Sequence, residues 1–123
     1  MALASGTQHR PTEIRLKKEE KVLEVDFEDG QSFRLPAEYL RVESPSAEVQ
    51  NHGQGKRIVP GRKHVGIIGI EAVGNYAVRL TFDDLHDSGI YSWDTLYNLG
   101  ANRDEIWQAY LDALAAHGLS RDP

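Results

Sequence analysis

The feature that most constrains the fold is an alternation of apolar and polar residues between Thr12 and Leu35, interrupted by Asp29-Gly30. Successive side chains of a strand point to opposite faces, so a two-residue period is typical of half-buried strands. Asp-Gly is a strong hairpin signal because both residue types tolerate a positive φ in a tight turn. Pro36 lacks the N–H that a strand ladder needs and ends the last strand. The pattern therefore predicts a three-stranded antiparallel meander.

After Pro36 the sequence predicts one helical turn over residues 37–41, with Tyr39 and Leu40 directed onto the sheet. From Glu43 to His64 the composition shifts to Ser, Gly, Pro, Asn, Gln and basic residues, which indicates an irregular segment. An irregular stretch of about 20 residues is uncommon in a compact domain and is commonly functional or disordered. Within it we expect at most a brief strand pairing around residues 58–59.

The second half of the chain returns to strand patterns, separated by turn residues. The three predicted strands are Val65–Ile70, Tyr76–Phe82 and Ser88–Trp93, with turns at Gly74-Asn75 and Asp83-Asp84. The first of these strands is rich in β-branched residues, and we expect its centre to be buried on both faces.

The C-terminal part has the pattern of an amphipathic helix, whose apolar stripe consists of Ile106, Trp107, Tyr110, Leu111 and Leu114. Asn102 precedes Glu105 by three residues, the spacing of a capping box, and His117-Gly118 is typical of a helix end. The predicted fold class is α+β: a mainly antiparallel sheet of about six strands with the C-terminal helix packed on one face.

Length and composition limit the function classes. The 123 residues suit one domain over residues 12–118, between a disordered leader (1–11) and a short tail (119–123). No apolar stretch approaches the roughly 20 residues of a membrane span, and the N-terminus lacks a signal-peptide core, so we expect a soluble cytoplasmic protein. The absence of cysteine excludes disulfides, thiolate zinc sites and cysteine-ligated clusters within this chain. The net charge of -5 argues against a nucleic-acid partner, which requires a basic face.

One candidate site is the acidic turn formed by Asp83, Asp84, His86 and Asp87. Clustered carboxylates with a histidine are able to bind a divalent metal weakly. The alternative is structural, because aspartates are common in turns, where their side chains accept hydrogen bonds from nearby backbone N–H groups.

A second candidate is the basic cluster formed by Lys56, Arg57, Arg62, Lys63 and His64. Such a cluster is able to bind a phosphate or an acidic protein partner, and the alternative is a solvated loop. Catalytic patterns are missing: no serine has the Gly-x-Ser-x-Gly setting, and residues 53–56 lack the spacing of a phosphate-binding loop. The sequence therefore predicts no catalytic residues and no enzymatic activity.

Three segments and one further residue carry a resemblance to a known family. They are LRVESPSAEV at residues 40–49, GNYAV at 74–78, HDSGIYSW at 86–93, and Leu96. In this combination the chain resembles the γ-butyrobetaine hydroxylase-like N-terminal domain, a family long described as a domain of unknown function. The resemblance spans residues 12–118. It implies a domain that, in the hydroxylases, precedes a 2-oxoglutarate- and iron-dependent oxygenase domain, which this sequence does not contain.

The resemblance also implies a degenerate metal site. The hydroxylase version binds a structural zinc through three cysteines and a histidine, and the matching positions here are Ser44, Ser46, Val49 and His86. Serine and valine are not zinc ligands at neutral pH, so we expect no metal or other cofactor. As a trace of the lost site, we expect His86 to lie near Ser44 or Ser46.

The family also occurs fused to P-loop ATPases that carry iron–sulfur clusters, which implies an accessory or docking role. The leading hypothesis is a stand-alone, non-catalytic interaction module that binds a protein partner through residues 43–64 and the facing segment 86–93. The alternative is a metal- or iron–sulfur-handling accessory protein that uses the region around His86. A catalytic role would require a pocket with paired acid and base groups near His86.

Overall fold

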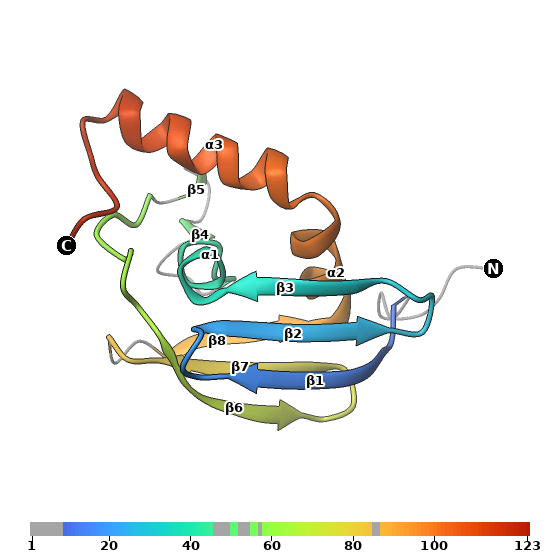
Figure 1. The fold of residues 1–123 in the computed structure, drawn as a ribbon. Helices are drawn as coiled ribbons and strands as arrows, with labels where there is room; N and C mark the ends of the chain where they lie inside the picture. Colours follow the sequence, from blue (N-terminus) through green and yellow to red (C-terminus); the bar gives the residue numbers. More distant parts are fainter. Residues whose placement is uncertain (1–8, 46–49, 52–54, 57, 85–86) are drawn as a thin grey trace.

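The computed structural model describes residues 9–45, 50–51, 55–56, 58–84 and 87–123 (Figure 1). In chain order the elements are β1 (Pro11–Lys17), β2 (Val22–Phe27), β3 (Ser32–Pro36), α1 (Ala37–Val42), β4 (Gln50–Asn51), β5 (Gly55–Lys56), β6 (Ile67–Val73), β7 (Ala77–Phe82), β8 (Asp87–Ser92), α2 (Trp93–Ala101) and α3 (Arg103–Ala116). Strands β1–β2–β3 form one sheet, β6–β7–β8 a second, and β4–β5 a short pair. Figure 1 shows the two larger sheets one in front of the other, with α1 and α3 on the side of β3.

The first sheet is the meander that the alternation predicts. Val25 in the central strand lies opposite Ile14 on one side and Phe33 on the other, and both pairings are antiparallel. In the β2–β3 turn, Gly30 has a φ of 90°, and its N–H donates to the Phe27 carbonyl at 3.0 Å. A positive φ of this kind favours glycine, so the Asp-Gly signal located the turn correctly.

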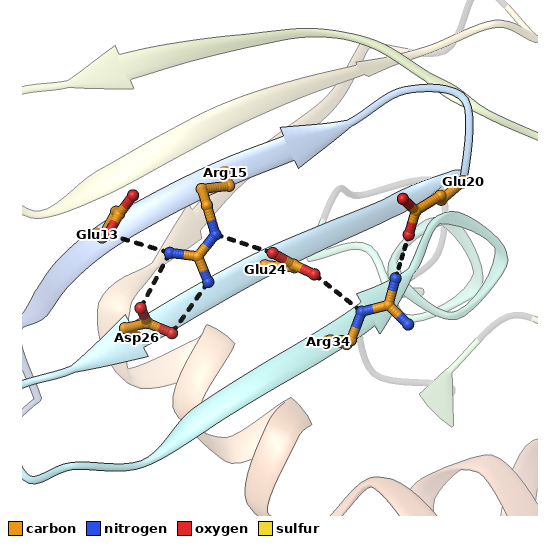
Figure 2. Close-up of polar contacts among 6 residues, drawn as sticks. All are labelled: Glu13, Arg15, Glu20, Glu24, Asp26 and Arg34. Carbon is orange, nitrogen blue, oxygen red and sulfur yellow. Dashed lines mark hydrogen bonds and ion pairs between the residues drawn. The ribbon is translucent and has the colours of Figure 1, made fainter.

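Charged side chains cover the outer face of this sheet (Figure 2). Arg15 donates from Nε to Glu24 at 2.8 Å and from Nη1 to Asp26 at 3.0 Å, while Arg34 donates to Glu24 at 2.9 Å and also pairs with Glu20. The hydrogen bond from Arg15, followed by that from Arg34, holds the pKa of Glu24 below its usual range. These charges neutralise one another across the three strands, which favours a structural role for this face.

The six longer strands form two sheets, whereas the sequence predicted one. Leu23 and Leu35 from the first sheet share a single core with Val78, Leu80 and Phe82 from the second. Each sheet has one apolar face, and packing the two faces together removes both from water without a covering layer of helices. The predicted single sheet is therefore wrong, while the α+β class and the antiparallel pairing are confirmed.

Strand β6 differs from its prediction in burial. Ile67 is buried, but Ile68 is 48% exposed and Ile70 is 37% exposed. Among the described strands β6 pairs with β7 alone, so it is an edge strand. The β-branched run was a valid strand signal, but the expectation of burial on both faces is wrong. The second sheet packs on the first through one face only, so Ile68 and Ile70 stay in solvent while Ile67 enters the shared core.

The predicted helical turn after Pro36 is α1, and all six of its residues are buried. The hydroxyl of Tyr39 donates to the Leu99 carbonyl in α2 at 2.6 Å. The hydroxyl of Tyr91 in β8 donates to the Leu40 carbonyl at 2.5 Å. These two bonds tie α1 to elements that follow it by 60 and 51 residues in the chain.

Helix α2 directly follows β8 and was not predicted. Ser92 is its N-cap, because its Oγ accepts a hydrogen bond from the backbone N–H of Thr95 at 3.1 Å. The helix lies close against β3 at Gly100, where a Cβ atom would lie only 2.3 Å from Cγ of Phe33. Gly100 thus permits a contact that a larger residue would block.

The predicted C-terminal helix is α3, and its predicted end is confirmed by Gly118, which has a φ of 64° just beyond the helix. The predicted capping box is wrong. The Asn102 side chain makes no capping bond and instead donates to Oδ1 of Asn98 at 2.7 Å. Because α2 occupies residues 93–101, Asn102 joins two helices and does not follow a loop.

The buried stripe of α3 packs mainly on α1 and the segment that precedes β6. Tyr110 and Leu114 form a cluster with Val42 of α1 and with Val59, and Trp107 lies between this cluster and the main core. The sequence predicted that α3 would cover an open face of the sheet, but its buried stripe packs mainly on α1 and the segment before β6. Its 14 residues make it the longest described helix, and no described helix is both long and apolar enough to cross a membrane.

Burial of Tyr39 and Tyr110 predicts a loss of stability at alkaline pH. Burial raises the pKa of each to about 12, above the value of about 10 expected in the unfolded chain. Because the unfolded chain ionises first, this stability is present below pH 10 and is lost as the pH rises from about 10 to about 12. We expect the free energy of unfolding to fall by at most about 1.4 kcal/mol per pH unit for each tyrosine.

Urea unfolding between pH 8 and pH 12 checks this prediction. Tyr39→Phe should flatten the pH dependence, although loss of the bond to Leu99 should cost about 1 kcal/mol at pH 8. Tyr76→Phe, at an exposed position, is the matched control and should keep the wild-type dependence. An unchanged slope in Tyr39→Phe would contradict the prediction.

Candidate functional site

The structure describes part of the predicted interaction region, which consists of residues 43–64 and 86–93. Within residues 43–64, Gln50 pairs with Lys56 and Asn51 with Gly55 in the short β4–β5 ladder. The strand pairing expected around residues 58–59 does not occur, because no strand includes these residues, and Val59 is a buried core residue. Ser46, Val49, Arg57 and His86 lie outside the described residues, so the predictions for them stay predictions.

An ion-pair bridge around the buried Arg41 organises the described part of this region. The Nε atom of Arg41 in α1 donates to Oδ2 of Asp84 in the β7–β8 turn at 2.9 Å. The Nε atom of Arg62 lies 2.8 Å from the same oxygen, as an ion pair without an aligned hydrogen bond. The side chains of Arg41, Asp84 and Arg62 are 2%, 21% and 33% exposed. The bridge therefore joins the end of α1, the segment before β6 and the β7–β8 turn.

This bridge brings together the chain regions that contain the degenerate zinc positions. Ser44 follows α1 and is fully buried, and its N–H donates to the Arg41 carbonyl at 3.4 Å. His86 follows Asp84 by two residues. The expected contact between His86 and Ser44 or Ser46 is not described, but the two segments that would make it are linked by the Arg41–Asp84 pair.

The acidic turn divides into an exposed and a bridged aspartate. Asp83 is exposed and donates its backbone N–H to the Gly66 carbonyl at 2.9 Å, whereas Asp84 accepts a hydrogen bond from Arg41 and forms an ion pair with Arg62. A metal ion at Asp84 would have to compete with Arg41 and Arg62 for the same carboxylate. Within the described ranges no group of three His, Cys, Asp or Glu side chains is arranged to hold a metal.

The basic cluster is partly structural. Arg62 belongs to the bridge and also donates to the Pro60 carbonyl at 3.2 Å. The Lys63 side chain is 44% exposed, with its Nζ 3.6 Å from Asp122, and His64 is exposed. The structure therefore groups Arg62, Lys63 and His64 in one surface segment but assigns them different surroundings.

The backbone of residues 60–66 is anchored at several points, and we call this stretch the basic segment. The N–H groups of Gly61 and Lys63 donate to the carbonyls of Ser120 and Arg121 at 2.9 and 3.1 Å. From the β1–β2 turn, Lys21 Nζ donates to the His64 carbonyl at 2.8 Å. Two parts of the chain that are remote in sequence thus fix the basic segment from two sides.

Arg41, the buried cation of the bridge, was not among the predicted site residues. Arg41 is the second most C-terminal residue of α1, and its neighbours Tyr39, Leu40 and Val42 are all core residues. A cation within an otherwise buried helical turn must meet an anion, since an unpaired buried charge is very costly. That pattern was the available signal, although it does not identify Asp84 as the partner.

Removal of the bridging carboxylate tests whether the bridge holds this region together. Asp84→Asn should lower the free energy of unfolding by about 2–4 kcal/mol, less than the loss for a fully buried pair because Asp84 keeps some solvent contact. Asp83→Asn, in the same turn but exposed, is the matched control and should cost less than about 0.5 kcal/mol. Urea unfolding at pH 7 measures both, and equal effects would contradict the prediction.

Comparison with known proteins agrees with this architecture. The family model "Gamma-butyrobetaine hydroxylase-like, N-terminal" matches residues 14–97. Two NMR solution structures contain chains that are each 47% identical to this chain. One has a TM-score of 0.81 and covers 94% of this chain and 91% of its own length. The other has a TM-score of 0.82, with coverages of 100% and 92%.

A third similar structure is the crystal structure of a protein of unknown function of the DUF971 family from Acidithiobacillus ferrooxidans. It is 42% identical, has a TM-score of 0.62, and covers 73% of this chain and 91% of its own. The search of curated proteins found no match. The resemblance carried by residues 40–49, 74–78 and 86–93 is thereby confirmed: the chain belongs to the γ-butyrobetaine hydroxylase-like N-terminal domain family.

Proposed function

We propose that this chain is a non-catalytic accessory module that binds an acidic protein partner through the basic segment and the neighbouring residues 56–57. The observation that carries the proposal is the anchoring of the basic segment. The Arg41–Asp84–Arg62 bridge and the bonds from Gly61, Lys63 and Lys21 hold its backbone.

A fixed backbone matters because binding normally costs the entropy of ordering loops and side chains. Where the folded protein already holds the backbone in place, exposed cations bind an acidic surface with a smaller loss of conformational entropy. Lys63 and His64 are exposed on the fixed segment, and Lys56 and Arg57 precede it in the sequence. The chain as a whole carries a charge of -5, so a local basic surface also orients an acidic partner toward one side.

The non-catalytic part of the proposal has separate support. The matched family is the N-terminal, hydroxylase-like domain, and the similar structure from Acidithiobacillus ferrooxidans is described as a protein of unknown function. No sequence motif supplies a nucleophile with its base. An accessory role is consistent with both observations.

Charge removal from the proposed surface tests the function. Arg62 is unsuitable because it pairs with Asp84, so the variant is Lys56→Ser, Arg57→Ser and Lys63→Ser. We expect this triple variant to lose the proteins that the wild type retains in affinity capture from cell extract. The matched control, Arg10→Ser, Lys17→Ser and Lys18→Ser, removes the same charge elsewhere and should retain them. Equal retention by both variants would contradict the proposed surface.

The second candidate function is metal or iron–sulfur handling around His86. The specific observation in its favour is the Arg41–Asp84 pair, which links the segment after α1 to the β7–β8 turn, where the family's zinc positions lie in sequence. In this role Asp83, Asp84, His86 and Asp87 would bind a divalent metal weakly or share it with a partner.

A metal titration of isotope-labelled protein checks this second function. Zinc or iron(II) at micromolar concentration should shift the amide signals of residues 83–87 and leave the rest of the spectrum unchanged. His86→Ala should abolish the shifts, whereas His117→Ala, at the far end of α3, should not. A response that begins only at millimolar metal would exclude this function for the isolated chain.

A further inference from the structure

A small cavity lies outside the region discussed so far, between the β3–α1 junction, helix α3 and the C-terminal segment. Its volume is about 240 Å³, and it is lined by Pro36, Glu38, Tyr39, Arg103, Trp107 and Arg121. No predicted site residue is among them. The cavity combines two guanidinium groups, one buried carboxylate and an aromatic wall. A complementary ligand would have both a negatively charged group and an apolar surface.

Arg121 is held in one orientation at this cavity. Its Nε and Nη2 atoms donate to the two carboxylate oxygens of Glu38 at 2.8 and 2.7 Å. Its guanidinium group also lies over the ring of Trp107, 5.4 Å from the ring centre. A bidentate pair and a ring contact together fix a side chain that would otherwise be mobile. Arg121 is thus preorganised, and its Nη1 has no acceptor among the described residues.

Arg103, at the first position of α3, supplies the second cation. Its Nη1 atom donates to the Arg34 carbonyl at 2.9 Å, while its Nε and Nη2 atoms have no acceptor in the described part of the chain. Glu38 neutralises one of the two guanidinium groups and is itself only 7% exposed. The cavity therefore keeps one net positive charge and unused N–H donors.

The remaining wall is apolar. Tyr39 and Trp107 pack edge to face with ring centres 6.0 Å apart, and Pro36 adjoins them. The Tyr39 hydroxyl is already bonded to Leu99, so the tyrosine offers its ring to the cavity and not a free polar group. A flat apolar group is the natural complement of such a wall.

We propose that this cavity binds a small organic carboxylate with a flat apolar body. The carboxylate would accept hydrogen bonds from Arg103 and Arg121, and the body would lie against Trp107 and Pro36. The ligand is small because a volume of about 240 Å³ is below the roughly 300–1,000 Å³ of sites for drug-sized molecules. The proposal goes beyond the proposed partner binding and does not depend on it, because the two sites share no side chain.

A titration of the isotope-labelled full chain with benzoate tests the proposal. The indole N–H signal of Trp107 should shift and saturate at low millimolar benzoate, whereas that of Trp93, which donates to the Asn75 carbonyl, is the internal control and should not move. Benzylamine has the same ring with the opposite charge and should not bind. Inorganic phosphate lacks the apolar body and should bind at least about tenfold more weakly.

Arg103→Gln distinguishes specific binding of the carboxylate in this cavity from non-specific binding of anions. Loss of its charged hydrogen bonds should weaken benzoate at least about tenfold, while the amide spectrum remains that of the folded protein. Arg10→Gln, at an exposed position elsewhere, is the matched control and should bind as the wild type does. The proposal is overturned if benzoate gives no saturable shift at tens of millimolar, if Arg103→Gln binds equally well, or if benzylamine or phosphate binds as tightly as benzoate.

Discussion

The structure depends on the complete burial of helix α1. All six residues of this short helix are buried, although two of them are charged. A helix of six residues is not stable alone, because nucleation fixes many dihedral angles for few hydrogen bonds. Its stability therefore comes from tertiary contacts, and α1 bonds to α2, to β8, to the β7–β8 turn and to the C-terminal segment. Segments that are far apart in the sequence are therefore held together around α1.

The two buried charges of α1 connect the fold to both proposed sites. Arg41 requires an anion and meets Asp84, which also pairs with Arg62 and so fixes the basic segment. Glu38 requires a cation and meets Arg121, which then forms one side of the cavity next to Trp107. Because a buried charge without a partner is far less stable than a paired one, the burial of α1 favours the ion pairs that connect it to both surfaces.

Much of the secondary structure was predictable because its signals are local. The alternation around the Asp29-Gly30 turn, the helical turn before Glu43 and the periodic stripe of α3 each follow from neighbouring residues. Helix α2 was not predicted because its nine residues follow β8 without a break. Its N-cap, Ser92, had been assigned to the predicted strand over residues 88–93. The charges of the basic residues identified them as candidates. The structural role of Arg62 was not predictable in this way, because it depends on Asp84, which lies 22 positions later in the sequence.

The sequence alone determined the α+β class, the first meander, the position of the turns and the family, because all of these depend on residue order over short distances. The tertiary structure decided that the strands form two facing sheets, that β6 lies at an edge, and that α3 packs on α1. It also decided which charges meet, since Glu38 with Arg121 and Arg41 with Asp84 are joined across 83 and 43 residues. Many long-range pairings are compatible with the same local pattern, and only the packing of one shared core around α1 selects among them.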